Sequence, residues 1–320
     1  MTAITALATV GQMAAVFLGA PWVIGMMRQV RARMEGRVGA GIGQPWRDLR
    51  KLLHKQQITP TGTTAVFAIA PAVVAGSTLL IAAAIPLITT ASPLDAAADL
   101  FAVVGLLLIG TVALALAGLD TGTAFGGMGA SRGIMVAALV EPTMLMAVFA
   151  LSVPAGSTNL GAIVSTTDAA PWLALSPSAL LSLAALVLVI VAEAGRLPVD
   201  NPSTHLELTM IHEAMVLEYA GPRLAVVELA SGMRLTVLLA LLVNLFAPIG
   251  IAGPEAGVAG VLVATVVIVV KVAALAAALA FVEVFLAKLR LFRVPELLAG
   301  SFVLGLLAVT SAYFFAGAGS

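Results

Sequence analysis

A short stretch of the chain, HLELTMIHEAMVLEYAGPR at residues 205–223, carries an unusual density of ionisable side chains. It contains two histidines, three glutamates and an arginine, whereas charged residues make up only 10% of the whole sequence. Histidines and carboxylates bind and release protons, and burial or a neighbouring charge moves their pKa values by whole units. Such a density of ionisable groups in a mostly apolar chain marks the stretch as a candidate functional segment.

The same stretch has the pattern of a helix. A helix over residues 203–219 places His205 and His212 on one face, and it places Glu207 and Glu218 on roughly the opposite face. The preceding Asn-Pro-Ser-Thr offers an N-cap. Apolar residues are too numerous here for a free loop. We therefore expect the helix to pack against the rest of the protein, with its carboxylates lining a polar space.

Metal and nucleotide sites are not expected in this chain. His212 and Glu213 begin the zinc-protease pattern H-E-x-x-H, but Val216 stands where the second histidine is required. Cysteine is absent, so the chain offers no thiolate ligands for iron–sulfur clusters or zinc. The glycines of residues 36–43 lack the G-x-x-x-x-G-K-S/T pattern that binds nucleotide phosphates. Any redox metal is expected in a partner.

Further charged residues lie within apolar segments or at their ends. They are Glu141, Glu193, Glu228, Arg234, Lys271 and Glu283. A charge at the centre of a bilayer is costly, and it usually faces the protein interior, a partner charge or water. Each is therefore a candidate functional residue. The alternative for each is a structural ion pair or, for Glu193 and Glu228, a position at the level of the lipid headgroups.

The elements that position these residues follow from composition. Hydrophobic residues make up 61% of the 320 residues, far above the soluble range, so we expect an all-α polytopic membrane protein in the plasma (inner) membrane. It forms a single membrane domain over residues 1–320. Eight spans are predicted, at about 3–27, 63–88, 100–119, 134–153, 177–192, 224–248, 257–286 and 297–315. Residues 161–175 are too short to span and are predicted as an outer loop or a short interfacial helix.

Basic residues predict the orientation, because Lys and Arg concentrate in cytoplasmic loops. Eight of the sixteen follow the first span: Arg28, Arg31, Arg33, Arg37, Arg47, Arg50, Lys51 and Lys55. If that loop is cytoplasmic, alternation of the spans also places Arg132, Arg196, Arg223, Lys288, Arg290 and Arg293 inside. The outer loops then hold no basic residue, and both termini lie on the outer side.

Two cytoplasmic segments are expected to meet soluble partners. Residues 28–62 form a basic loop in which Trp46, Leu49 and Leu52 lie on one side of a predicted amphipathic helix at the membrane surface. Residues 193–223 form an acidic loop and helix. The residues predicted to dock a partner are Arg37, Gln44, Pro45, Trp46, Arg47, Arg50, Lys51, His205 and His212.

Three stretches in order, GRVGAGIGQPWRDLRKLLHK, EAGRLPVDNPSTHLELTMIHEAMVLEYAGPR and EVFLAKLRLFRVPELL, resemble the family of respiratory complex I subunit 1 and formate hydrogenlyase subunit 4. The resemblance covers essentially the whole chain. The residues of the second and third stretches resemble those of the hydrogenase branch of the family. The subunit of that branch is the membrane anchor of group 4 membrane-bound nickel–iron hydrogenases. The first loop is shorter than the Gly-Pro-rich loop that helps to shape a quinone chamber in complex I, so the resemblance favours the hydrogenase anchor.

The resemblance implies roles for individual residues. It assigns an acidic proton path to Glu141, Glu193, Asp200, Glu207, Glu213 and Glu218, with Arg196 beside it. We extend the path to Glu228 and expect its charge partner to be Arg234, Lys271 or Glu283. The metal cofactors implied, iron–sulfur clusters and a NiFe centre, belong to partner subunits.

The implied function is that of a membrane anchor and coupling subunit of a redox complex, which links electron transfer to proton or sodium translocation. Its expected partners are hydrogenase large and small subunits, a ferredoxin-like iron–sulfur subunit, antiporter-like membrane subunits and membrane lipids, with no nucleic acid. Two alternatives remain open: a quinone-reducing complex I subunit 1 and a free-standing secondary transporter. Inverted repeats, which many transporters show, are not found in the sequence.

Overall fold

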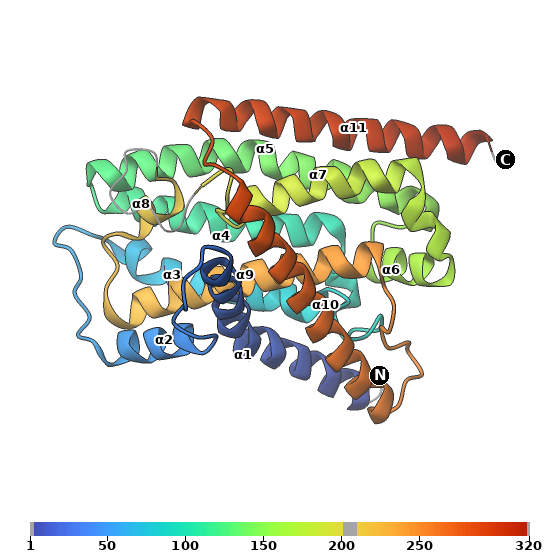
Figure 1. Ribbon diagram of the computed structural model, residues 1–320, viewed down its shortest axis with the longest axis horizontal. Helices are drawn as coiled ribbons and strands as arrows, with labels where there is room; N and C mark the ends of the chain where they lie inside the picture. Colours follow the sequence, from blue (N-terminus) through green and yellow to red (C-terminus); the bar gives the residue numbers. More distant parts are fainter. Residues whose placement is uncertain (1–2, 201–209, 319–320) are drawn as a thin grey trace.

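The computed structural model describes residues 3–200 and 210–318, and these form a bundle of helices (Figure 1). The α-helices are α1 (Ala3–Met34), α2 (Gln44–His54), α3 (Ala65–Ala84), α4 (Leu100–Asp120), α5 (Ala124–Ala155), α6 (Leu160–Ala169), α7 (Pro177–Glu193), α8 (His212–Val216), α9 (Gly221–Phe246), α10 (Val258–Phe285) and α11 (Val294–Ala318). Three short 3-10 helices occur at Asp95–Ala97, Pro171–Leu175 and Leu291–Arg293. The expected all-α fold is confirmed.

Polar residues start the helices that follow tight connections. The side chains of Thr64, Asp99, Thr123, Asn159 and Ser176 each accept a hydrogen bond from a backbone N–H in the first turn of α3, α4, α5, α6 and α7, respectively. Such caps satisfy donors that would otherwise lack a partner. They fix where the apolar segments enter the bundle.

Seven helices in the described residues are long and apolar enough to cross a membrane: α1, α3, α4, α5, α9, α10 and α11. The remaining predicted span, 177–192, forms as α7, which has only 17 residues, at the short end of what crosses a ~30 Å hydrocarbon core. It packs between α5 and α11. The chain is a multi-pass membrane protein.

Two helices are longer than the sequence pattern predicted. α1 continues to Met34, so Arg28 and Arg31 lie in its last turns and not in a loop. α5 begins at Ala124, ten residues before the predicted position, and therefore includes Arg132. Small and polar residues in these extensions hide the helix from a hydropathy pattern.

α9 is the central helix, and it packs against α1, α3, α7 and α10. α4, α5 and α11 complete the side of the bundle beyond α3 and α7, and α10 crosses the other side obliquely (Figure 1). The apolar segment of α9 is 67% buried, whereas that of α10 is only 17% buried. α10 therefore presents most of its surface to its surroundings.

Different short helices lie at the two ends of the bundle. α2 and α8 lie at one end, at the left in Figure 1, and α6 lies at the other. The first turns of α1 and the last turns of α11 lie toward the end that carries α6. Both described ends of the chain thus lie at the same end of the bundle. That this end faces the outer side of the membrane stays a prediction.

Two predictions about short helices had different outcomes. Residues 161–175 contain α6 and a 3-10 helix, as expected of a short interfacial helix. The continuous helix predicted over 203–219 is wrong in its described part, because only His212–Val216 is helical and Met210 and Ile211 are not. Residues 201–209, with His205 and Glu207, lie outside the described residues.

Candidate functional site

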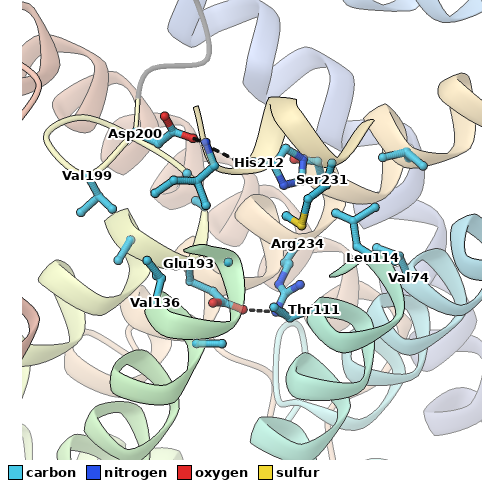
Figure 2. A pocket seen from close by; sticks show the side chains of 18 residues that line it. Val74, Thr111, Leu114, Val136, Glu193, Val199, Asp200, His212, Ser231 and Arg234 are labelled. Atoms are coloured by element: carbon cyan, nitrogen blue, oxygen red, sulfur yellow. Dashed lines mark hydrogen bonds and ion pairs between the residues drawn. The ribbon is translucent and has the colours of Figure 1, made fainter. Parts of the chain in front are cut away.

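α7 ends inside the bundle, where its last residue meets a buried arginine. Glu193 Oε1 forms an ion pair with Arg234 Nη2, and Arg234 is the fourteenth of the 26 residues of α9. The same Nη2 donates hydrogen bonds to Leu107 O at 2.9 Å and to Thr111 Oγ1 at 2.7 Å on α4. Figure 2 shows Glu193 and Thr111 on opposite sides of the guanidinium. Three helices thus hold one buried charge pair.

A second carboxylate lies near this pair. Glu141, midway along α5, is 8% exposed, and its charge and that of Arg234 act on one another. Among the described residues, Glu141 Oε1 and Arg234 Nε are buried without a hydrogen-bond partner. Unpaired buried polar atoms are rare and costly, and in native structures they mark a bound water or a second conformation. One arginine therefore serves two glutamates.

A small cavity of about 70 Å³ adjoins the charge pair (Figure 2). Its polar lining includes Thr111, Glu193, Asp200, His212, Ser231 and Arg234. The volume exceeds that of a single water-sized probe, and polar partners for water surround it. The cavity therefore has the size and the chemistry to hold water beside Glu193.

Asp200 fixes the segment at the other end of the small cavity. It is 2% exposed, and its Oδ2 accepts hydrogen bonds at 3.2 Å from the backbone N–H groups of Ile211 and His212. Its Oδ1 accepts a bond of 3.2 Å from Lys288, which follows α10. Asp200 thereby ties the start of α8 to the end of α10.

A fourth buried carboxylate, Glu283 near the end of α10, lies close to two arginines. It pairs with Arg31 on α1, and Arg196 Nη1 lies 4.0 Å from its Oε1. Burial lowers the pKa of Arg196 below its usual range, Glu283 opposes this effect, and Arg31 and Arg28 add to it. The cluster links α1, α10 and the segment after α7.

A large cavity of about 700 Å³ lies between α1, α2, α9 and the segment after α7. Its charged lining includes Arg28, Arg31, Arg196, Asp200, Glu213 and Glu228. The large and small cavities share the lining residues Ala194, Gly195, Asp200, His212 and Ser231. The two cavities therefore share a wall, and together they extend from the surface formed by α1 and α2 to the Glu193–Arg234 pair; we call these two adjoining cavities the polar route.

The structure brings most of the predicted path residues to this route. Asp200, Glu193 and Arg234 line the small cavity, Glu213 and Glu228 line the large one, and Arg196 lies beside Glu283. Glu218 is half-buried beyond α8 and lines neither cavity. Glu207 lies outside the described residues.

The predicted charge partners of Glu228 make other contacts in the structure, so the partner of Glu228 stays a prediction. Arg234 pairs with Glu193, and Glu283 pairs with Arg31. Lys271 instead donates to Asn244 Oδ1 at 3.0 Å and to Ile249 O at 3.2 Å, near the α6 end of α9. Six residues separate Glu228 from Arg234, a rotation of about 600° along a helix, so the two side chains leave α9 in different directions.

α2 is the amphipathic helix that the sequence predicted. Pro45 and Leu49 are buried against the bundle, and Trp46 is half-buried. Gln44 Nε2 donates to Asp48 at 2.8 Å, and Asp48 lies 3.8 Å from Arg28. The remaining predicted docking residues on this side, Arg37, Arg47, Arg50 and Lys51, are exposed, while His212 is half-buried in the cavity wall.

Sequence reasoning did not single out several residues of the site. Thr111 and Ser231 carry no signal, because hydroxyls are common in apolar helices. Lys288 and Arg31 were assigned to the cytoplasmic side without a role. A helix extended to Met34 would have indicated Arg31, since it lies three residues after Arg28 and on a similar face.

Comparison with known proteins identifies the family. A sequence profile described as NADH dehydrogenase matches residues 7–313. The chain belongs to this family. Hydrogenase-4 component C of Escherichia coli K12 is 38% identical over 253 residues, which cover 79% of this chain and 78% of the relative. Formate hydrogenlyase subunit 4 of the same strain is 35% identical over 296 residues, or 92% and 94% of the two chains. The resemblance stated from the three sequence stretches is confirmed.

A solved structure shares the fold of this NADH dehydrogenase family member. A chain of the membrane-bound sulfane sulfur reductase, an archaeal respiratory membrane complex, superposes with a TM-score of 0.84 over 96% of this chain and 99% of that chain. The sequence identity is 21%, so this likeness concerns the fold. In the described part of the chain, no three His, Asp or Glu side chains are grouped as metal ligands.

Proposed function

We propose that this chain is the membrane anchor and coupling subunit of a multi-subunit redox complex in the plasma membrane. The observation that carries the proposal is the polar route, whose two adjoining cavities extend to Glu193 and Arg234. The names of the relatives, a hydrogenase component and a formate hydrogenlyase subunit, support a hydrogenase-type peripheral arm as the partner. In this proposal the iron–sulfur clusters and the NiFe centre belong to that arm.

The proposed path begins at the large cavity, which α2 lines in part. Asp200, His212 and Glu213 exchange protons there with water. Water in the small cavity carries a proton from this group to Glu193, because both cavities share the walls formed by Asp200 and His212. When the charge of the docked arm changes, the loop residues that line the large cavity transmit the electrostatic effect to the path.

Arg234 is the proposed coupling element. Protonation of Glu193 removes the charge that holds the guanidinium, and the unpaired Nε of Arg234 and Oε1 of Glu141 offer the next contact. Glu141, protonated at the start, then releases its proton to a neighbouring antiporter-like subunit, and its negative charge attracts Arg234. Transfer of the proton from Glu193 to Glu141 returns Arg234 to Glu193, so each cycle moves one proton.

The test replaces each carboxylate in the assembled complex. Glu193→Gln and Glu141→Gln are each expected to leave hydrogen turnover within about twofold of the unaltered complex. Ion uptake per turnover in inverted membrane vesicles is expected to fall by about a hundredfold, the scale of losing a proton-transferring group. Glu296→Gln, in the exposed first turn of α11, is the matched control.

Normal ion uptake per turnover in both variants contradicts the coupling role. Failure of the complex to assemble is identified separately by the amount of the peripheral arm that copurifies. Ion transport by the purified chain alone in liposomes would instead favour a free-standing transporter.

A second candidate function is quinone reduction at the large cavity. Its volume of about 700 Å³ lies within the range of small-molecule sites, and the family profile is that of NADH dehydrogenase. Inhibition of the complex by a quinone-site inhibitor, with loss of inhibition in Gly232→Leu at the cavity wall, would favour this function over direct hydrogenase coupling.

A further inference from the structure

A third hollow opens on the side of the bundle, between α1, α9 and α10. It has a volume of about 300 Å³, and we call it the lateral groove. Its walls include Gly19 and Met26 on α1, Ala240 on α9 and Val269 on α10, and nearly all of its lining surface is apolar. Among the described residues, none lines both the groove and either cavity of the proposed proton path.

The groove faces the apolar surroundings of the bundle. Trp22 and Val269 in its wall are 52% and 55% exposed, although both belong to spanning helices. α10, which forms one wall, is the least buried of the spans. An occupant therefore enters from the hydrocarbon region of the bilayer and must itself be largely apolar.

One end of the groove is marked by interfacial and cationic residues. Trp22 and Ile42 line this end, and tryptophan is typical of the level of the lipid headgroups. Arg47 on α2 donates to Ala40 O at 3.4 Å, which places its guanidinium beside the residues that lead into Ile42. Arg50 and Lys51 are exposed on the same helix. Arg47 therefore places one positive charge near this end of the groove.

The length of the groove fits one acyl chain. Along α1 the lining runs from Met26 to Gln12, and 14 residues at 1.5 Å each give about 21 Å. One leaflet of the hydrocarbon core is about 15 Å deep. A tilted acyl chain anchored at Trp22 would therefore follow the groove through its leaflet.

We propose that the lateral groove binds one acyl chain of an anionic phospholipid from the bilayer, with the phosphate beside Arg47. The apolar walls select an acyl chain, and the cation at one end selects a negative headgroup. A neutral isoprenoid quinone fits the walls but gains nothing from Arg47, and a zwitterionic phospholipid gains less than an anionic one.

The proposal is tested by native mass spectrometry of the full-length chain in detergent, with phosphatidylglycerol or phosphatidylcholine of identical acyl chains added. Retention of one phosphatidylglycerol is expected, with weaker retention of phosphatidylcholine. Gly19→Leu fills the groove, since a Cβ at Gly19 meets no atom within 4 Å, and should lower retention by about tenfold. Arg47→Gln should reduce the preference for phosphatidylglycerol by about fivefold.

Gly105→Leu on α4 is the matched control, because a Cβ there also meets no atom within 4 Å and the residue does not line the groove. Its retention of lipid should equal that of the unaltered chain. Equal retention of both lipids, unchanged retention in Gly19→Leu, or displacement of the phospholipid by a quinone would each overturn the proposal. Arg47 is on the surface, so its variant tests the headgroup contact even if Gly19→Leu unfolds.

Discussion

In the middle of the bundle, Arg234 pairs with Glu193, and a second buried carboxylate, Glu141, acts on its charge from α5. Both carboxylates in ionised form would leave one negative charge without compensation in a region of low dielectric constant, where such a charge is costly. One proton shared among the three groups removes that cost. The arrangement is thus suited to holding a single mobile proton, which is the property that the proposed function requires.

Removing Arg234 should destabilise the protein more than removing the whole ion pair. Arg234→Gln leaves Glu193 buried without its partner and is expected to cost about 3–5 kcal/mol. The double variant Glu193→Gln/Arg234→Gln should recover at least half of that loss, because no uncompensated charge remains. Thermal unfolding of Arg234→Gln, Glu193→Gln and the double variant in detergent measures the coupling energy of the pair. Additive effects would show that the two residues do not stabilise one another.

Tyr219, just before α9, provides a second test at this scale. Its hydroxyl donates to Phe67 O at 2.9 Å and its ring stacks on Phe67, and burial raises the pKa of Tyr219 to about 12, with smaller effects from Arg223 and Asp120. The folded-state pKa exceeds the unfolded value of about 10. The neutral phenol therefore stabilises the fold fully below pH 10, and this stabilisation is lost as pH rises through about 12.

In a Tyr313→Phe background, Tyr219 is the only tyrosine, and its phenolate absorbance should titrate with a midpoint near pH 12. Tyr219→Phe should lower stability at neutral pH by about 1 kcal/mol and should remove its part of the alkaline decline. A midpoint near the ordinary value of about 10 would mean that Tyr219 is open to water.

At the residue scale, the sequence singled out candidate charged residues, whereas their partners became known only from the structure. Rare ionisable residues in apolar segments, such as Glu141 and Arg234, stand out because burying a charge is costly. Pairing depends on which helices touch and on their rotation about their axes. That information lies in tertiary packing, so the Glu193–Arg234 pair and the Arg31–Glu283 pair were not predicted.

At the scale of single elements, the contact between α5 and α8 fixes the cavity wall. Gly129 on α5 lies against α8, and a Cβ there would be 2.8 Å from Ala214 Cβ and 3.1 Å from Ile211 O. Ile211 and His212 are the residues that Asp200 holds. The small residue therefore lets α8 approach α5 closely enough to complete the small cavity.

Gly129→Ala should push α8 away from α5 and cost about 1–3 kcal/mol. Gly127→Ala, two residues away in the same helix, meets no atom within 4 Å and should instead stabilise the protein by about 0.5–1 kcal/mol. Thermal unfolding compares the two variants, and ion uptake by the complex should fall only in Gly129→Ala. Equal stabilities would show that α8 adjusts without cost.

Helix existence was predictable, and helix length was less so. Long apolar runs identified the spans because a bilayer demands them. The ends of α1 and α5 carry glycine, arginine and other polar residues that hydropathy scores as loop, yet caps and packing keep them helical. The predicted helix over 203–219 is shorter in its described part, where only α8 forms. At Ile211 the backbone N–H donates to the side chain of Asp200 and not to a helical carbonyl.

At the scale of the whole molecule, the orientation in the membrane is still a prediction. The chain has no cysteine, so single cysteines are introduced without further changes. Lys51→Cys on α2 and Asp168→Cys on α6 are exposed at opposite ends of the bundle. A membrane-impermeant maleimide should label Asp168→Cys in intact cells and Lys51→Cys only in inverted vesicles. The reverse pattern would place both termini in the cytoplasm.

The shortness of α7 has an electrical consequence. Glu193, its last residue, meets Arg234 halfway along α9, and the large cavity, with the exposed Arg28 and Arg37 in its lining, occupies the space on the α2 side. Water in such a cavity carries the potential of the adjoining solution inward. A membrane voltage, worth about 2.3 kcal/mol per elementary charge per 100 mV, then falls mainly over the remaining half of the bundle. A proton on Glu193 has therefore crossed little of the membrane voltage. Its transfer from Glu193 to the far side of the membrane crosses most of the voltage, which opposes or drives that transfer.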